Sequence, residues 1–164
     1  MKFWQILTGL VLTVVLFVSP LSAQAASSSS ITRSAGDEVQ SQDFSGQNLI
    51  GKEFTNIKLE NANFSNADLR GGVFNATLLE GVNLHGVNFG QGIAYLAKFK
   101  NADLSDAVLT DAMMLRSTFD NVNVTGADFT NAVLDGVEMK KLCVKASGVN
   151  SKTGVDTRES LGCR

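Results

Sequence analysis

Residues 62–71 read Ala-Asn-Phe-Ser-Asn-Ala-Asp-Leu-Arg-Gly, and this stretch decides the fold of the chain. It holds two five-residue units, each with a small residue, an amide or acid, and a large apolar residue in the same order. A period of five matches neither the 3.6-residue period of an α-helix nor the two-residue period of a flat strand. The small and the large residue lie two apart, so both point to one side of an extended chain. The pattern therefore predicts a chain that bends once in every five residues.

The same period continues without slipping from Gln42 to Lys141, which makes twenty consecutive units. A large apolar residue stands in each unit except one, where the slot holds Ala94. One bend per unit winds the chain into coils, whose backbone groups pair with the coils above and below at about 4.8 Å. Residues that suit turn geometry recur near the bend; they are Gly46, Gly51, Asn56, Asn61, Asn66, Gly71, Gly81, Gly86 and Gly126.

The units follow an Ala-(Asp/Asn)-Leu-Xaa-Xaa pattern, as in Ala67-Asp68-Leu69 and Ala102-Asp103-Leu104. This pattern resembles that of the pentapeptide-repeat family. The resemblance implies an all-β solenoid, namely a right-handed quadrilateral β-helix with four repeats per coil and about five coils over residues 42–141. Solenoids of this kind need terminal caps that cover the exposed edges of the first and last coils.

The N-terminal segment predicts export. Lys2, the apolar run Ile6–Val18 and the small residues of Ala23-Gln24-Ala25 are typical of a signal peptide over residues 1–25. An uncleaved membrane anchor is the alternative, although a span needs about 20 apolar residues. Cleavage would leave no membrane span. Residues 26–41 are expected to form a flexible Ser-rich segment and an N-terminal cap, with a short helix over Ser34–Gln40.

Residues 142–164 are predicted to form a C-terminal cap, with a partner-docking element as the alternative. Cys143 and Cys163 are the only cysteines, and an even pair in an exported chain predicts a disulfide rather than two free thiols. Asp156 and Glu159 have the spacing of a helix capping box, after which Leu161 can pack on the last coil. The Leu-Cys and Thr-Arg-Xaa-Ser-Leu-Gly-Cys segments resemble the tails of pentapeptide-repeat proteins from cyanobacteria and the chloroplast thylakoid lumen. That resemblance implies the lumen or the periplasm as the location.

With four repeats per coil, residues twenty apart share one face. The column Asp43, Asn63, Asn83, Asp103, Asn123 is polar, whereas the column that begins at Glu53 is otherwise apolar. The second column and its neighbours form a candidate interaction patch, called the apolar face here; it comprises Val73, Ile93, Tyr95, Leu96, Met113, Leu115 and Val133. Monomers rarely expose such patches, which favours a protein partner, self-association or a membrane-adjacent surface. The alternative is that apolar residues simply suit strands. On the inside, Phe74 and Met114 are expected to fill the space beside Ala94.

The sequence predicts no catalytic, cofactor-binding or metal-binding residues. His85 is the only histidine and both cysteines are terminal, so a zinc site is not expected. A Ser-His-Asp arrangement around His85 would arise only by chance, because the repeat itself supplies many Ser and Asp residues. The polar column is interpreted as solvated or hydrogen-bonded between coils rather than as a metal ladder. Gly90-Gln91-Gly92 lacks the further glycine and the helix of a dinucleotide-binding motif.

The net charge of the chain also argues against some classes of function. After residue 25 the chain carries 16 acidic and 13 basic residues, a net charge of −3, without the basic stripe of a nucleic-acid binder. The expected function is a non-enzymatic structural or protein-interaction module with an unknown partner and no cofactor. The alternative comes from another branch of the family, in which acidic rods mimic DNA and bind a topoisomerase. The modest charge and the export signal both argue against this alternative.

Overall fold

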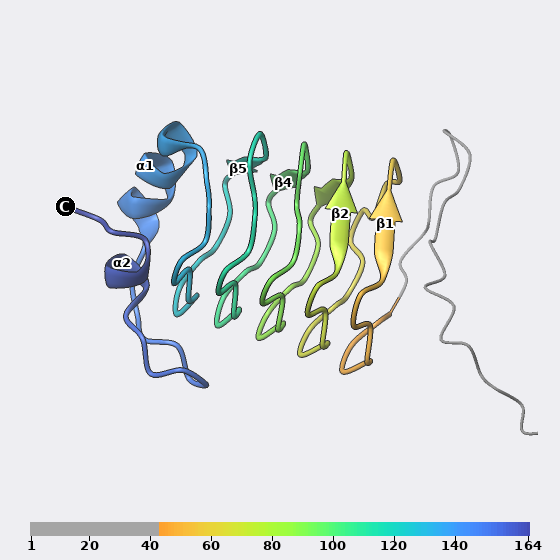
Figure 1. Ribbon diagram of the computed structural model, residues 1–164, viewed down its shortest axis with the longest axis horizontal. Helices are drawn as coiled ribbons and strands as arrows, with labels where there is room; N and C mark the ends of the chain where they lie inside the picture. Colours follow the sequence, from red (N-terminus) through yellow and green to blue (C-terminus); the bar gives the residue numbers. More distant parts are fainter. Residues whose placement is uncertain (1–42) are drawn as a thin grey trace, which may run out of the picture.

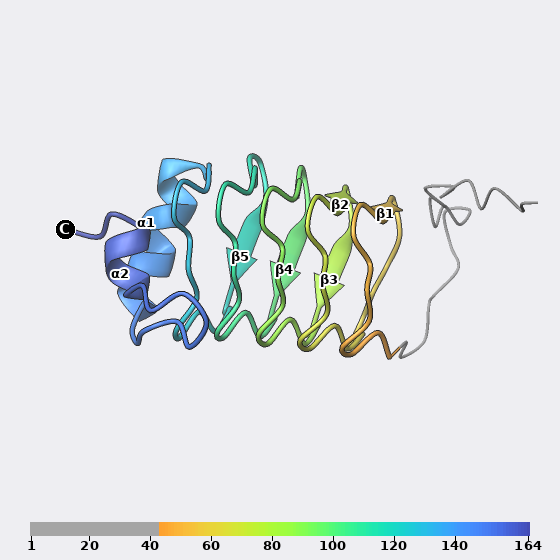
Figure 2. The same cartoon turned by 60° about the horizontal axis from the view of Figure 1, so that its bottom comes forward.

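The computed structural model describes residues 43–164. The predictions of a signal peptide, a Ser-rich segment, an N-terminal helix and a first repeat beginning at Gln42 concern residues outside this range, at least in part. The described chain winds into a row of stacked coils, and two helices lie side by side at the C-terminal end of the stack (Figures 1 and 2). The coils therefore form a solenoid with one helical end.

Five short strands mark two faces of the coils. β1 (Glu53–Thr55) pairs in parallel with β2 (Val73–Asn75). A second parallel sheet has the order β3 (Leu78–Glu80), β4 (Lys98–Lys100) and β5 (Thr118–Asp120). In every pair the partner of a residue lies twenty positions later, and isolated bridges with the same offset continue along the other faces. Four five-residue units thus complete one coil, as the recurrence at twenty predicted.

Large apolar side chains fill the axis of the solenoid. Bridges between Asn63, Asn83 and Asp103 put the adjacent Phe64, Leu84 and Leu104 in one column, and all three are at most 2% exposed. Phenylalanine rings stack along other columns, with centroids 5.1 Å apart for Phe54 and Phe74 and 4.9 Å apart for Phe99 and Phe119. Full burial of such a side chain contributes about 1.5–3 kcal/mol, so the repeated large slot is the main source of stability.

The bends adopt left-handed backbone at five-residue intervals, from Gly46 at φ 64° to Asn131 at φ 57°. Glycine, and to a lesser degree asparagine, tolerates this conformation. On one side of the coil the N–H of Ala67 donates to the carbonyl of Phe64 at 3.0 Å, which closes a type II turn. On the side of β1 and β2 the buried Thr77 hydroxyl donates instead to the Phe54 carbonyl at 2.6 Å. Both arrangements satisfy the backbone of the bend.

Phe89 packs in the part of the core around Ala94 in addition to Phe74 and Met114, which are both buried. The ring of Phe89 lies over Gly92 and stacks on Phe74 at 5.4 Å. The remaining cavity, whose lining includes Phe74 and Met114, has a volume of about 10 Å³ and is apolar. Such a space is at the lower limit for one water molecule and offers it no polar partner. It is a packing defect rather than a binding site.

The coil ends earlier than predicted. Helix α1 (Gly136–Lys145) begins before Lys141, so the last expected unit is helical and its large residue, Met139, lies on α1. Glu, Met, Lys and Leu favour helix in this segment. α2 (Thr157–Ser160) follows, with the Asp156 carboxylate accepting from the N–H groups of Arg158 and Glu159. Neither helix is long and apolar enough to cross a membrane.

Side chains from the C-terminal segment satisfy the open edge of the last coil. Within the stack, the N–H of the large residue in a unit donates to the carbonyl nineteen residues later, as Leu104 does to Asn123 at 2.8 Å. At the edge, carboxylates of Asp135 and Glu138 accept from the N–H groups of Arg116 (2.7 Å) and Phe119 (3.0 Å). The Ser160 hydroxyl accepts from Phe129 N–H at 3.0 Å. These contacts replace the carbonyls that a further coil would supply.

Leu142 and Leu161 are buried in the core cluster, and a disulfide joins Cys143 to Cys163 as the sequence predicts. Leu161 thus packs against the coils from the segment after α2. On the loop-entropy model, a bridge that closes a loop of this size contributes about 3 kcal/mol. The bridge therefore holds the C-terminal segment in place against the stack.

Replacing Gly92 by Ala should destabilise the protein by about 1–3 kcal/mol, as overpacking of a core does. A Cβ at this position would stand 2.5 Å from the Phe89 ring. Gly136→Ala is the matched control, because a Cβ there meets nothing within 4 Å and alanine favours the helix. Urea unfolding of both variants measures the difference. Equal stability of the two would contradict the proposed role of Phe89.

Glu138→Ala should cost about 1–3 kcal/mol, because it leaves the N–H of Phe119 without its acceptor. Glu138→Gln keeps a side-chain oxygen and should cost much less. Lys141→Met removes the exposed ion pairs of Lys141 with Glu138 and Asp120 but keeps the Glu138 carboxylate, and it should cost under about 1 kcal/mol. Thermal unfolding ranks the three variants, and a Gln variant as unstable as the Ala variant would refute the acceptor role.

Candidate functional site

The apolar face is built on the coil face that carries β1 and β2. Parallel bridges join Val73 to Ile93, Ile93 to Met113, and Met113 to Val133, so these four side chains form one column. The spacing between rungs of such a ladder is about 4.8 Å. Val133 is 50% exposed and Met113 is 39% exposed, while Val73 and Ile93 are half-buried. The column is therefore a continuous apolar strip open to solvent.

The other predicted residues of the apolar face widen this strip on one side. Tyr95 and Leu115 occupy the position two residues after the column in successive coils, and both are half-buried. Leu96 at the adjoining bend is 44% exposed. The guanidinium of Arg116 stands 5.9 Å from the centroid of the Tyr95 ring, in a cation–π arrangement that borders the face. The structure thus brings all seven predicted residues to neighbouring positions.

The bend beside the apolar face is strained. Ala76, Leu96 and Arg116 have φ of 51°, 56° and 57°, at a corner where the first coil has Asn56. Left-handed backbone costs a residue with a side chain roughly 1–2 kcal/mol. The Leu96 N–H also reaches the Leu115 carbonyl only at 3.4 Å. Left-handed backbone occurs at every bend of the solenoid, so the candidate site rests on the exposed apolar column beside this corner.

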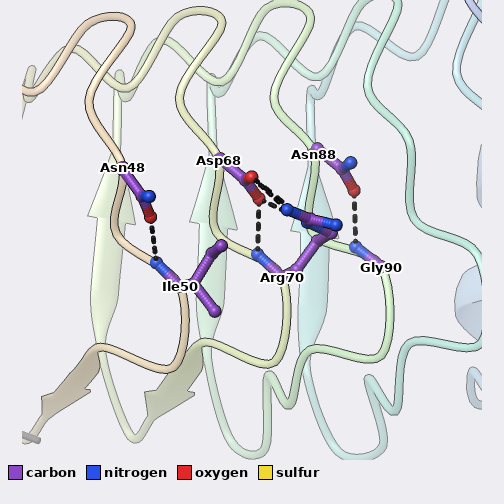
Figure 3. A network of polar contacts seen from close by, with 6 residues as sticks. All are labelled: Asn48, Ile50, Asp68, Arg70, Asn88 and Gly90. Carbon is purple, nitrogen blue, oxygen red and sulfur yellow. Dashed lines mark hydrogen bonds and ion pairs between the residues drawn. The ribbon is translucent and has the colours of Figure 1, made fainter. Parts of the chain in front are cut away.

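The polar columns have a structural role. In Asp43, Asn63, Asn83, Asp103 and Asn123, one side-chain oxygen accepts from the N–H two residues later, at 2.9–3.1 Å. Asn63 and Asn123 also donate to the carboxylates of the preceding coil. Figure 3 shows the same local turn on the next face, where Asn48, Asp68 and Asn88 accept from Ile50, Arg70 and Gly90. These oxygens are occupied by the backbone, which explains the recurrent Asp and Asn.

His85 does contact a serine. Its Nδ1 lies 2.9 Å from the Ser105 hydroxyl, twenty residues later on the same exposed face. The neighbouring carboxylate of Asp106 accepts instead from the N–H and hydroxyl of Ser151, at 2.8 and 2.5 Å. A serine nucleophile needs a base that a third group orients, and within residues 43–164 no carboxylate is hydrogen-bonded to the His85 imidazole. The same residues contain no cluster of three metal-binding side chains.

Sequence reasoning did not find the contacts that the loop between the two helices makes with the stack. Asn150, 1% exposed, donates through Nδ2 to the carbonyls of Asp106 and Ala107 at 3.2 Å and of Gly126 at 2.8 Å. Lys152 Nζ donates to the carbonyl of Gly86. The loop therefore runs back along one corner of the stack. Asn150 and Lys152 lie outside the five-residue period, and no local pattern links them to these bends.

Comparison with known proteins gives consistent matches. A family model described as pentapeptide repeats matches residues 43–75, 58–91, 97–131 and 116–145, with eight copies. A crystal structure of a pentapeptide repeat protein from the Arabidopsis thaliana thylakoid lumen is 37% identical. It covers 77% of this chain and 88% of its own, with a TM-score of 0.75.

Two curated Arabidopsis thaliana proteins match shorter segments. Thylakoid lumenal protein TL20.3 is 55% identical over 40 residues, which is 24% of this chain and 14% of that protein. Thylakoid lumenal 15 kDa protein 1 is 45% identical over 47 residues, or 29% and 21% of the two chains. The matches thus span about a seventh and a fifth of these relatives' own length.

The contact between Asp106 and Ser151 should make stability depend on pH in the acid range. The hydroxyl and N–H of Ser151 stabilise the carboxylate and lower the pKa of Asp106 below its usual value, which is about 3.9. A carboxyl with a lowered pKa in the folded state stabilises the protein above its ordinary pKa, and this contribution is lost as pH falls through the lowered value. Asp106→Asn should therefore melt lower than wild type at pH 6 and equally at pH 2.

Asp111→Asn is the matched control for this prediction. Asp111 is also a bend residue, with φ of 56° against 58° for Asp106, so both substitutions place Asn in the same backbone conformation. The control should follow the wild-type melting curve at every pH. A constant difference between Asp106→Asn and wild type from pH 2 to 6 would exclude the carboxylate as the cause.

Proposed function

Because this chain belongs to the pentapeptide-repeat family, we propose that it is a non-enzymatic protein-interaction module whose docking surface is the apolar face. Its coils form the right-handed β-helix solenoid of that family. The observation that carries the proposal is the bridged column from Val73 to Val133, an apolar strip that continues over four successive coils.

The solenoid suits a docking role because the strip is rigid before any partner binds. The backbone of Val73, Ile93 and Met113 is bridged on both sides and that of Val133 on one, so binding orders little of the protein and costs little conformational entropy. Covering a half-exposed Val, Met or Ile gives about 1 kcal/mol. Several rungs must therefore be covered together, which favours a partner with an extended apolar surface, either another protein or a second copy of this chain.

The proposed location is the thylakoid lumen, with the periplasm as the alternative. The support consists of the signal-peptide features of residues 1–25 and of the similarity to three proteins whose names place them in the thylakoid lumen. Binding of a topoisomerase by DNA mimicry is less well supported. Residues 43–164 hold 14 acidic and 12 basic side chains, too balanced for the dense negative field that such mimicry needs.

Ile93→Asp combined with Met113→Asp tests the docking surface. The two carboxylates would be desolvated in any complex that covers the face, so partner recovery in a pull-down from source-cell extract should fall at least tenfold. If a second copy is the partner, sedimentation velocity should show a shift toward monomer.

Leu78→Asp combined with Thr118→Asp is the matched control. These residues occupy the same slot on the adjacent face, where they neighbour Lys98 in the β3–β4–β5 ladder, so they add the same charge away from the apolar face. This control variant should recover as much partner in the pull-down as the wild type does. Unchanged recovery and unchanged sedimentation for the Ile93 and Met113 variant would refute the proposed function.

A further inference from the structure

The second surface with binding features lies at the C-terminal end of the stack. A groove of about 610 Å³ is lined by residues of α1 and by the segment from α2 to the C-terminal residue; this end groove comprises Met139, Lys140, Cys143, Val144, Arg158, Gly162, Cys163 and Arg164. Its volume falls within the range of about 300–1,000 Å³ that is typical of ligand sites. The end groove shares no residue with the apolar face, so its role is independent of the function proposed above.

The orientation of α1 explains the apolar floor. Leu142 and Glu138 are buried against the last coil, where Glu138 accepts from Phe119 N–H. The opposite side of the helix therefore faces outward, and Val144 is 84% exposed. Met139 and the disulfide between Cys143 and Cys163 are partly buried against the core and form the apolar floor of the groove, and the exposed Val144 stands at its rim. Because the disulfide is covalent, it fixes the two walls relative to each other.

The charged side chains of the end groove are all basic, namely Lys140, Arg158 and Arg164. Arg158 Nη1 donates to the Cys143 carbonyl at 2.8 Å, which holds its guanidinium beside the disulfide. The net charge of the surrounding segment is also positive. Residues 136–164 contain six basic and three acidic residues, whereas residues 43–135 contain six basic and eleven acidic. The positive potential of this end is thus a local property of a chain that is acidic as a whole.

We propose that the end groove binds an extended acidic segment of a partner protein, with one apolar side chain on the floor and carboxylates on both sides. An apolar floor between cations fits such a segment, because the carboxylates pair with Lys140, Arg158 and Arg164 while the apolar side chain covers Met139 and the disulfide and contacts Val144 at the rim. Guanidinium groups bind carboxylates with good geometry. The concave shape favours a peptide over an anionic membrane, on which basic amphipathic surfaces lie flat.

Fluorescence anisotropy with three labelled heptapeptides tests this proposal on the purified full chain. The first peptide has a central leucine flanked by three aspartates on each side. The second replaces the leucine by serine, and the third replaces the aspartates by lysines. The first should bind, the second at least fivefold more weakly, and the third not detectably. Affinity for the first should also fall as salt rises from 50 to 300 mM, because salt screens exposed charges.

Two sets of variants locate the site. Lys140→Glu combined with Arg164→Glu should lower the affinity for the acidic peptide at least tenfold, and Val144→Ser should lower it several-fold. None of these residues is buried. Lys98→Glu combined with Lys58→Glu, on exposed positions of another face, is the matched control for net charge and should change the affinity less than twofold. Circular dichroism confirms that each variant is folded.

Three results would overturn the proposal. They are absence of binding of the acidic leucine peptide at millimolar concentration, an equal loss of affinity in the Lys58 and Lys98 control, and retention of affinity in the Lys140 and Arg164 variant. Sedimentation of the protein with anionic phosphatidylglycerol vesicles that is abolished by Lys140→Glu and Arg164→Glu, without binding of the peptide, would assign the end groove to a membrane instead. None of these results bears on the apolar face.

Discussion

The structure depends on the parallel hydrogen-bond ladder that joins each residue to the one twenty positions later. No coil can satisfy its own backbone, because its strands lie in different sheets and their partners lie in the neighbouring coils. Stability is therefore a sum of contacts between adjacent coils. The same dependence creates a problem at the last coil, and here it is solved by side chains: Asp135, Glu138 and Ser160 accept the N–H groups that have no following coil.

The ladder also explains why each face of the solenoid displays columns of similar side chains. Because successive coils stack in register, a residue type that recurs every twenty positions becomes a continuous column on one face. The polar column built from Asp43 and its successors uses its oxygens for local turns, so its composition follows from folding. The column from Val73 to Val133 has no such structural requirement, and the adjoining corner keeps Leu96 in strained backbone. The apolar face is for this reason the surface that we propose for docking.

Much of the fold follows from the sequence because the five-residue unit encodes a local rule. The large residue, the small residue and the bend are each specified within one unit, so the register, the buried columns and the left-handed bends could be predicted. The disulfide followed from the position of Cys143 and Cys163 near the end of the chain.

Features that depend on breaks in the rule were missed or placed incorrectly. The helix from Gly136 replaced a last unit that still fitted the period, because helix propensity and the lack of a further coil outweighed the pattern. The Phe89 ring packs over Gly92 and on Phe74, a contact that a column-by-column prediction did not consider. The contacts of Asn150 and Lys152 join the loop to bends that are 24 to 66 residues away, and nothing local indicates them. The end groove arises from the same non-periodic segment.

The twenty-residue register has a consequence for how such a chain can change length. Inserting a single five-residue unit before Ile93 would keep every large side chain inside, yet it would turn all later columns by a quarter of a revolution. Met113 and Val133 would then leave the strip that begins at Val73, and the C-terminal helices would meet the stack from a different side. Inserting four units would lengthen the rod and leave every surface continuous. Duplication of whole coils is therefore the change in length that preserves both the core and the pattern displayed on the outside.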